Sequence, residues 1–176
     1  MLDMERQKQS IENINRLFGV SGEVEVVCKP KGFNTWCRLP YPDHPLGCPN
    51  FGKKKGCPPN VDYFLDVVEP EVKIAYLYFN FEEYLNWRRS NHPDWTERAL
   101  RNPRHFQRHL DAVLRKNIKA LEISDFIPVY NPEAMGVNLH KTCSSVGINL
   151  QWPPKDRMYR IALLAKKNIG VMCATF

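Results

Sequence analysis

The sequence has no long hydrophobic run. No stretch of about eighteen apolar residues, the length that a membrane-spanning helix requires, occurs among its 176 residues. The first residues, Met1 to Lys8, carry several charged side chains and lack the apolar segment of a secretory signal peptide. We therefore expect a cytoplasmic protein with no membrane association.

The signatures of several enzyme classes are also missing. The chain has no Walker loop, no G-x-G-x-x-G motif and no nucleophile elbow. It also has no pair of cysteines at the C-x2–4-C spacing that structural zinc sites usually show. No internal repeat, low-complexity tract or linker interrupts it. These absences disfavour a zinc finger, and because no motif names a reaction, the sequence leaves open whether the protein is an enzyme.

Composition and charge set the remaining bounds. Hydrophobic residues make up 43% of the chain, an ordinary share for a globular protein with a real core. The length indicates one domain over residues 1–176, which we expect to be a metal-binding domain. A net charge of +6 and a pI of about 9.0 permit an anionic partner such as nucleic acid.

Hydrophobic patterning predicts an α/β protein: a single layered domain with a mixed sheet, helices and a long cysteine-bearing loop at 29–59. A run that is nearly all apolar or aromatic at 72–79 predicts a central strand covered on both faces. Further strands are expected at 23–28, 148–152, 159–165 and 170–175. Helices are expected at 3–18, 60–68, 81–89, 93–101, 103–123 and 131–146. The interleaving of strands with helices gives the class.

The loop at 29–59 carries Cys37, Cys48 and Cys57. Proline follows Cys48 and Cys57 directly, and because it has no N–H and a fixed φ, the chain cannot continue there as a helix or central strand. The glycines between these cysteines let backbone N–H groups turn toward one point, and the run Lys53–Lys55 favours thiolates. Six cysteines in a cytoplasmic chain indicate metal, cluster or redox use. The loop thus predicts a metal or cluster site, the alternative being a basic surface loop with free thiols.

An iron–sulfur cluster suits this spacing because such clusters accept varied cysteine spacing and often a Cys-Pro ligand. We therefore favour [4Fe-4S], with zinc as the alternative. Three cysteines on four irons would leave one iron open for sulfur or electron chemistry on a small or nucleotide-like substrate. Cys143, on one helix face with His140, is the candidate fourth ligand or else a partly buried helix cysteine. Cys28 and Cys173 lie in apolar segments and are expected in the core.

A second function is suggested by basic residues on one face of the 103–123 helix: Arg104, Arg108, Arg115 and Lys119. We call these four residues the basic stripe. With Trp87 and Trp95 nearby, the stripe predicts a basic RNA-binding module whose metal is structural, the alternative being a solvent-exposed helix face. His44, His92, His105 and His109 form no zincin motif, although His105 and His109 are four apart. They are expected to be solvated rather than metal ligands.

The cysteine motif resembles a family of small, uncharacterised, cysteine-rich proteins of anaerobic archaea and bacteria that are predicted to bind metal. The resemblance rests on Trp36-Cys37, on Cys48-Pro-Asn-Phe-Gly and on Cys57-Pro-Pro; the stretch 133–142, followed by Gly147, is similar to that family's C-terminal segment. This chain has a longer gap between Cys37 and Cys48, and no cysteine at 125–132, where the family has a second cluster. The resemblance implies metal or iron–sulfur binding without a settled reaction.

Overall fold

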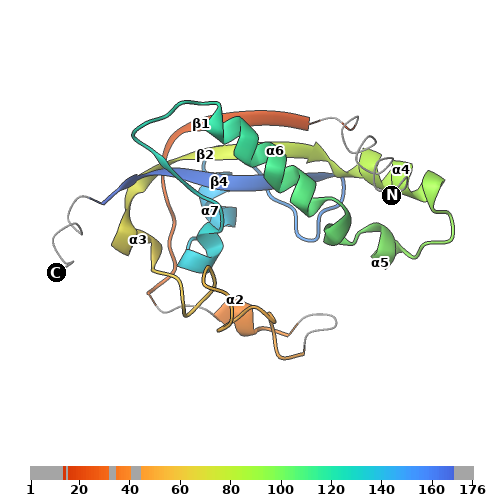
Figure 1. Ribbon diagram of the computed structural model, residues 1–176, viewed down its shortest axis with the longest axis horizontal. Coiled ribbons are helices and arrows are strands. Elements are labelled where there is room, and N and C mark those ends of the chain that lie inside the picture. Colours follow the sequence, from red (N-terminus) through yellow and green to blue (C-terminus); the bar gives the residue numbers. More distant parts are fainter. Residues whose placement is uncertain (1–13, 15, 32–34, 41–44, 169–176) are drawn as a thin grey trace. The chain divides into compact units, whose positions relative to one another are not determined.

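The structure is a computed structural model that describes residues 14, 16–31, 35–40 and 45–168 (Figure 1). A four-stranded antiparallel sheet has the order β1-β2-β4-β3. Its strands are β1 (Arg16–Glu25), β2 (Val68–Asn80), β3 (Ile127–Val129) and β4 (Arg157–Lys167). The expected α/β class is confirmed, and the strands, for which a mixed sheet was expected, run antiparallel.

Short helices connect the strands. They are α2 (Thr35–Arg38), α3 (Phe64–Val67), α4 (Phe81–Asn91), α5 (Glu97–Leu100), α6 (Gln107–Lys119) and α7 (Leu139–Ser144), with 3-10 turns η1 (Pro103–His105) and η2 (Pro132–Met135). Polar caps start several of them: the side chain of Asn80 accepts a hydrogen bond from the Glu83 N–H at the start of α4. The predicted strands at 72–79 and 159–165 and the helix at 81–89 are confirmed.

Other predicted elements differ from the structure. Residues 16–18, expected to end a helix at 3–18, belong to β1 instead, because pairing with β2 overrides the helical pattern there. Apart from residue 14, the rest of that expected helix lies outside the described residues. The expected strand at 170–175 lies outside them as well. Residues 148–152 form no strand. The expected helix at 131–146 is split at Gly136, whose φ of 96° no helix can contain.

By its internal packing, the chain forms two compact units. Among the described residues, unit 1 comprises 14, 16–20, 75–122 and 150–161. In its core, Phe79 of β2 stacks on Phe106 with ring centroids 6.1 Å apart, and the buried face of α6 carries Leu110, Leu114 and Ile118. Helix α6 is tied to β4 by the Arg160 Nε–H, which donates to the Asp111 carboxylate over 2.7 Å. One face of this part of the sheet is therefore covered by α6.

Among the described residues, unit 2 comprises 21–31, 35–40, 45–74, 123–149 and 162–168, and it contains the cysteine loop. The chain after β1 is anchored by backbone contacts just after η2. Cys28 and Val137 form an isolated antiparallel β-bridge, and the Lys29 N–H donates to the Gly136 carbonyl over 2.8 Å. The Tyr63 hydroxyl donates to the Lys29 carbonyl over 2.7 Å from the far end of the loop. Both ends of the cysteine loop are thus held by the same small framework.

Candidate metal centre

The cysteine loop is folded by tight backbone turns. The Cys48 N–H donates to the Cys37 carbonyl over 2.7 Å, which draws the two cysteine-bearing segments together. The Cys57 N–H donates to the Lys54 carbonyl over 3.0 Å, and the Gly52 N–H donates to the Pro58 carbonyl over 2.8 Å. A segment of sequence with almost no regular secondary structure is therefore closed on itself, as the prolines and glycines predicted.

Gly47 is the backbone position on which this closure depends. It is buried, its φ is 85°, and a Cβ built on it would lie 2.6 Å from the Cys37 carbonyl oxygen. Both observations require glycine, one through the left-handed backbone and the other through lack of space. Gly47 thus allows the turn that brings the Cys48 N–H to the Cys37 carbonyl.

Cys37 lies within electrostatic reach of both other loop cysteines, Cys48 and Cys57. All three are free and half-buried. The pKa of Cys37 is raised, first by burial and then by the negative charges of Cys48 and Cys57, while the ammonium group of Lys29 acts to lower it. Thiols separated by up to twenty positions in sequence are therefore gathered into one half-buried cluster. We call Cys37, Cys48 and Cys57 the thiol cluster.

This cluster is not a finished coordination shell. Across the part of the chain that the structure describes, no group of three or more His, Cys, Asp or Glu side chains is arranged to hold a metal ion. The thiol cluster therefore supplies donors of a suitable kind near one another, and a bound group would have to draw them into coordination distance.

Cys143 and His140 occupy different environments on α7. Cys143 is fully buried, and burial, with a smaller effect from Glu133, raises its pKa to about 12. His140 is exposed. The two side chains therefore do not share an accessible face, and the charges that shift the pKa of Cys37 are those of the thiol cluster and Lys29.

The remaining cysteines stand apart from the cluster. Cys28 is half-buried beside Tyr63; its pKa is raised by burial, against which a hydrogen bond from Tyr63 acts. Cys173 and His44 lie outside the described residues. Cys28 therefore belongs to the backbone framework that anchors the loop, where it pairs with Val137 in an isolated β-bridge.

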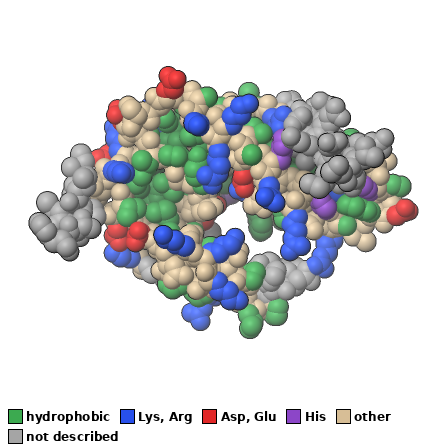
Figure 2. All heavy atoms as spheres, viewed as in Figure 1, with side chains coloured by type: hydrophobic (Ala, Val, Ile, Leu, Met, Phe, Trp, Pro, Cys, Tyr) green, Lys and Arg blue, Asp and Glu red, His purple; other side chains and the backbone are tan. Residues whose placement is uncertain are grey.

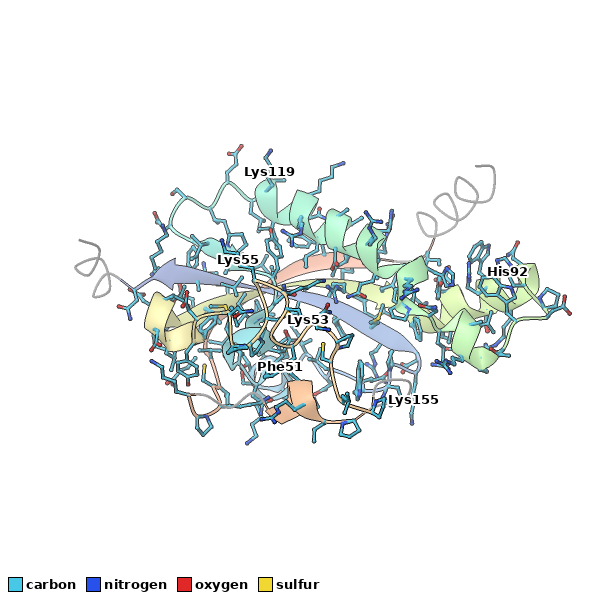
Figure 3. The ribbon with its side chains drawn as sticks, turned by 60° about the horizontal axis from the view of Figure 1, so that its bottom comes forward. Phe51, Lys53, Lys55, His92, Lys119 and Lys155 are labelled. Carbon is cyan, nitrogen blue, oxygen red and sulfur yellow. The ribbon has the colours of Figure 1, made fainter. Side chains whose placement is uncertain are left out.

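Sequence reasoning missed Lys29, whose charge acts on Cys37, and Glu133, whose charge acts on Lys29. Lys29 has a pKa lowered by burial, while the charges of Cys37 and Glu133 act to raise it. Glu133 follows Lys29 by more than a hundred positions, so only its place in the family-like stretch at 133–142 could have pointed to it. The lysines expected to favour thiolates, Lys53–Lys55, are exposed on the loop (Figure 3), and Lys29 is the cation that acts on Cys37.

The basic stripe is exposed as predicted, with all four side chains in solvent and the apolar side of α6 buried. On the face drawn in Figure 2, Lys and Arg side chains predominate over Asp and Glu. The nearby histidines are engaged: His92 stacks on Trp95 at 4.0 Å between ring centroids, and His109 Nε2 lies 2.7 Å from Arg16 Nη1. RNA binding by the stripe stays a prediction.

No family model, curated protein or solved structure matches the chain. The resemblance through the cysteine motif therefore stays a prediction from the residues alone. Within the described residues, none of the helices is long and apolar enough to cross a membrane.

Proposed function

We propose that the protein binds an iron–sulfur cluster, or in the alternative a zinc ion, through Cys37, Cys48 and Cys57. The observation that carries this proposal is the 2.7 Å hydrogen bond from the Cys48 N–H to the Cys37 carbonyl, which brings these two cysteines together, and the charges of Cys48 and Cys57 both act on the pKa of Cys37. Half-buried thiolates that repel one another are stabilised by a cation between them, and thiolates are the ligands that iron–sulfur clusters and zinc prefer.

The donor set favours a site with one open position. The thiol cluster offers three ligands, whereas the pKa of the buried Cys143 is shifted by burial and by Glu133 and not by the charges of the thiol cluster. A bound [4Fe-4S] cluster would supply an iron open to sulfur or electron chemistry. Closed sites are typical of structural zinc and open ones of catalytic zinc; by analogy, three protein ligands favour a reactive role on a small or nucleotide-like substrate.

Loading such a site releases protons. Ligand thiols must be deprotonated to bind metal, and the raised pKa of Cys37 means that its proton is held more tightly than in an ordinary cysteine. Metal affinity should therefore rise with pH through the neutral and weakly alkaline range. Lys29 opposes the repulsion within the cluster and so assists deprotonation of Cys37.

The proposal is tested by metal and sulfide analysis of anaerobically purified protein. Cys48→Ser and Cys57→Ser should each lose most of the bound metal, because loss of one ligand opens the whole site. Cys28→Ala is the matched control: its thiol is also half-buried in unit 2, yet it lies outside the thiol cluster, so this variant should keep the metal. Full retention in both serine variants would overturn the proposal.

The same analysis separates cluster from zinc and open from closed sites. Iron with acid-labile sulfide identifies a cluster, whereas zinc without sulfide identifies the alternative. Retention of metal by Cys143→Ala supports the open position, and loss of metal in that variant, if it remains folded, would show that Cys143 closes the site.

A further inference from the structure

Unit 1 has a second sheet face, opposite α6, that carries a cluster of tyrosines. Phe79 and Arg160 face α6, as their contacts with Phe106 and Asp111 show. Because side chains alternate along a strand, Tyr78 of β2 and Tyr159 of β4 project from the opposite face, and Tyr76 joins them. Tyr76, Tyr78 and Tyr159 are all partly exposed; we call them the tyrosine face.

The three rings form one platform across two strands that are neighbours in the sheet. Tyr159 meets Tyr76 edge-on, with centroids 6.2 Å apart and planes at 72°, and Tyr78 at 5.7 Å and 64°. The Tyr76 phenol lies over Gly19 of β1, where a Cβ would come within 2.5 Å of its Cζ. Leu17, two residues before Gly19, is 61% exposed. The platform thus extends onto β1 and is open to solvent there.

The loop at 150–156 leads into β4, the strand that carries Tyr159, and presents an exposed indole. Trp152 is 95% exposed. The loop that presents it is held by two bonds: the Lys155 N–H donates to Gln151 Oε1 over 3.0 Å, and Arg101 Nη1 donates to the Pro154 carbonyl over 2.9 Å. Hydrogen bonds thus fix the loop that exposes Trp152, and tryptophan is enriched among the residues that contribute most to binding energy at interfaces.

Positive charge accompanies these aromatic rings. Lys155 and Arg157 are exposed between Trp152 and Tyr159, Arg157 with a 3.3 Å ion pair to Asp156. Between Trp152 and Tyr159 the chain carries two cationic side chains against one carboxylate, that of Asp156. These side chains therefore favour an anionic ligand over a neutral or cationic one.

We propose that the tyrosine face binds single-stranded nucleic acid. Bases can stack on tyrosine rings presented by a sheet, as in other single-strand binders, whatever their sequence. Lys155 and Arg157 would contact phosphates at one end of the platform, and Trp152 would stack a further base. This surface belongs to unit 1, whereas the thiol cluster belongs to unit 2. Within unit 1 it lies on the other side of the sheet from α6, which carries most of the basic stripe.

The test measures fluorescence anisotropy of a labelled oligouridylate and a labelled oligothymidylate of about twelve nucleotides, with the full-length protein. We expect binding that weakens steeply between roughly 50 and roughly 200 mM salt. Tyr159→Leu and Tyr78→Leu should weaken binding at least about fivefold, because the leucine side chain cannot stack on a base. Tyr159→Phe and Tyr78→Phe keep the ring and should bind like the wild type.

A matched pair of charge reversals locates the surface. Arg157→Glu, beside the tyrosine face, should weaken binding more than Arg108→Glu on the stripe, although both change the net charge equally. The reverse order would assign binding to the stripe and overturn the proposal. So would a folded wild-type protein that binds neither oligonucleotide at low salt, or leucine variants that are folded by circular dichroism and bind normally. Because both oligonucleotides are tested on protein without metal as well, failure here leaves the metal proposal untouched.

Discussion

Cys143 and Tyr84 are buried side chains whose pKa values are each raised to about 12, mainly by burial. In both, the folded state holds the proton more tightly than the unfolded chain does. The stability that this difference contributes is fully present below the unfolded pKa, which is 9.0 for cysteine, and is lost as pH rises toward the folded value. These two residues therefore make the fold sensitive to alkaline pH.

The alkaline loss can be measured for Cys143 alone. In metal-free protein, we expect the free energy of unfolding of the wild type to fall from pH 8 to pH 10, with Cys143 contributing about 1 kcal/mol of that fall. Cys143→Ala should show a smaller fall, since the titrating thiol is gone. Urea unfolding at the two pH values gives both quantities, and an equal fall in the two proteins would show that Cys143 is no more basic when folded than when unfolded.

Among the elements, those fixed by local pattern were predictable. The apolar runs at 72–79 and 159–165 predicted β2 and β4, because a continuous apolar run of this length is typical of a buried strand and not of a turn. The Pro and Gly content predicted the cysteine loop and the turns that gather Cys37, Cys48 and Cys57.

Features set by contacts between distant segments were not predictable from the sequence. At Gly136, where the expected helix is split, a Cβ would lie 2.9 Å from Cε2 of Tyr63, a residue far away in the sequence. Lys29 reaches Cys37 through the fold, and no spacing rule indicates it. The tyrosine face was not predicted, because the apolar run of β2 indicated a strand covered on both faces. In the structure, Tyr76 and Tyr78 are partly exposed.

For the cysteine loop as an element, Gly47 is the most sensitive position. Gly47→Ala should destabilise the folded protein by about 1–3 kcal/mol, since a side chain at φ 85° is strained and meets the Cys37 carbonyl. It should also reduce bound metal, because Cys37 and Cys48 would be pushed apart. Gly56→Ala, in the same loop with open space around its Cβ and no positive φ, is the control and should match the wild type. Thermal melts and metal analysis of both variants test this; equal behaviour would contradict it.

For the whole molecule, metal and fold should be linked. A ligand that binds only the folded state stabilises it by RT ln(1 + [L]/Kd), so removing the metal with a chelator should lower the melting temperature by several degrees. Cys57→Ser should melt near the metal-free wild type and respond little to chelator. Calorimetry of the wild type and Cys57→Ser, each with and without chelator, makes the comparison. If metal removal does not change the melting temperature of the wild type, metal binding does not stabilise the fold.

Both units are assembled from three separated stretches of chain, and the strands themselves cross between units: β2 supplies residues 68–74 to unit 2 and 75–80 to unit 1, and β4 supplies 157–161 to unit 1 and 162–167 to unit 2. Any contiguous fragment that contains one complete unit therefore also contains most of the other. A protease that cleaves once within the exposed Lys53–Lys55 run should yield a nicked, two-chain species that stays associated in native gels and separates only in denaturant. Dissecting this protein into independently expressed pieces would require co-expression of complementary fragments rather than truncation.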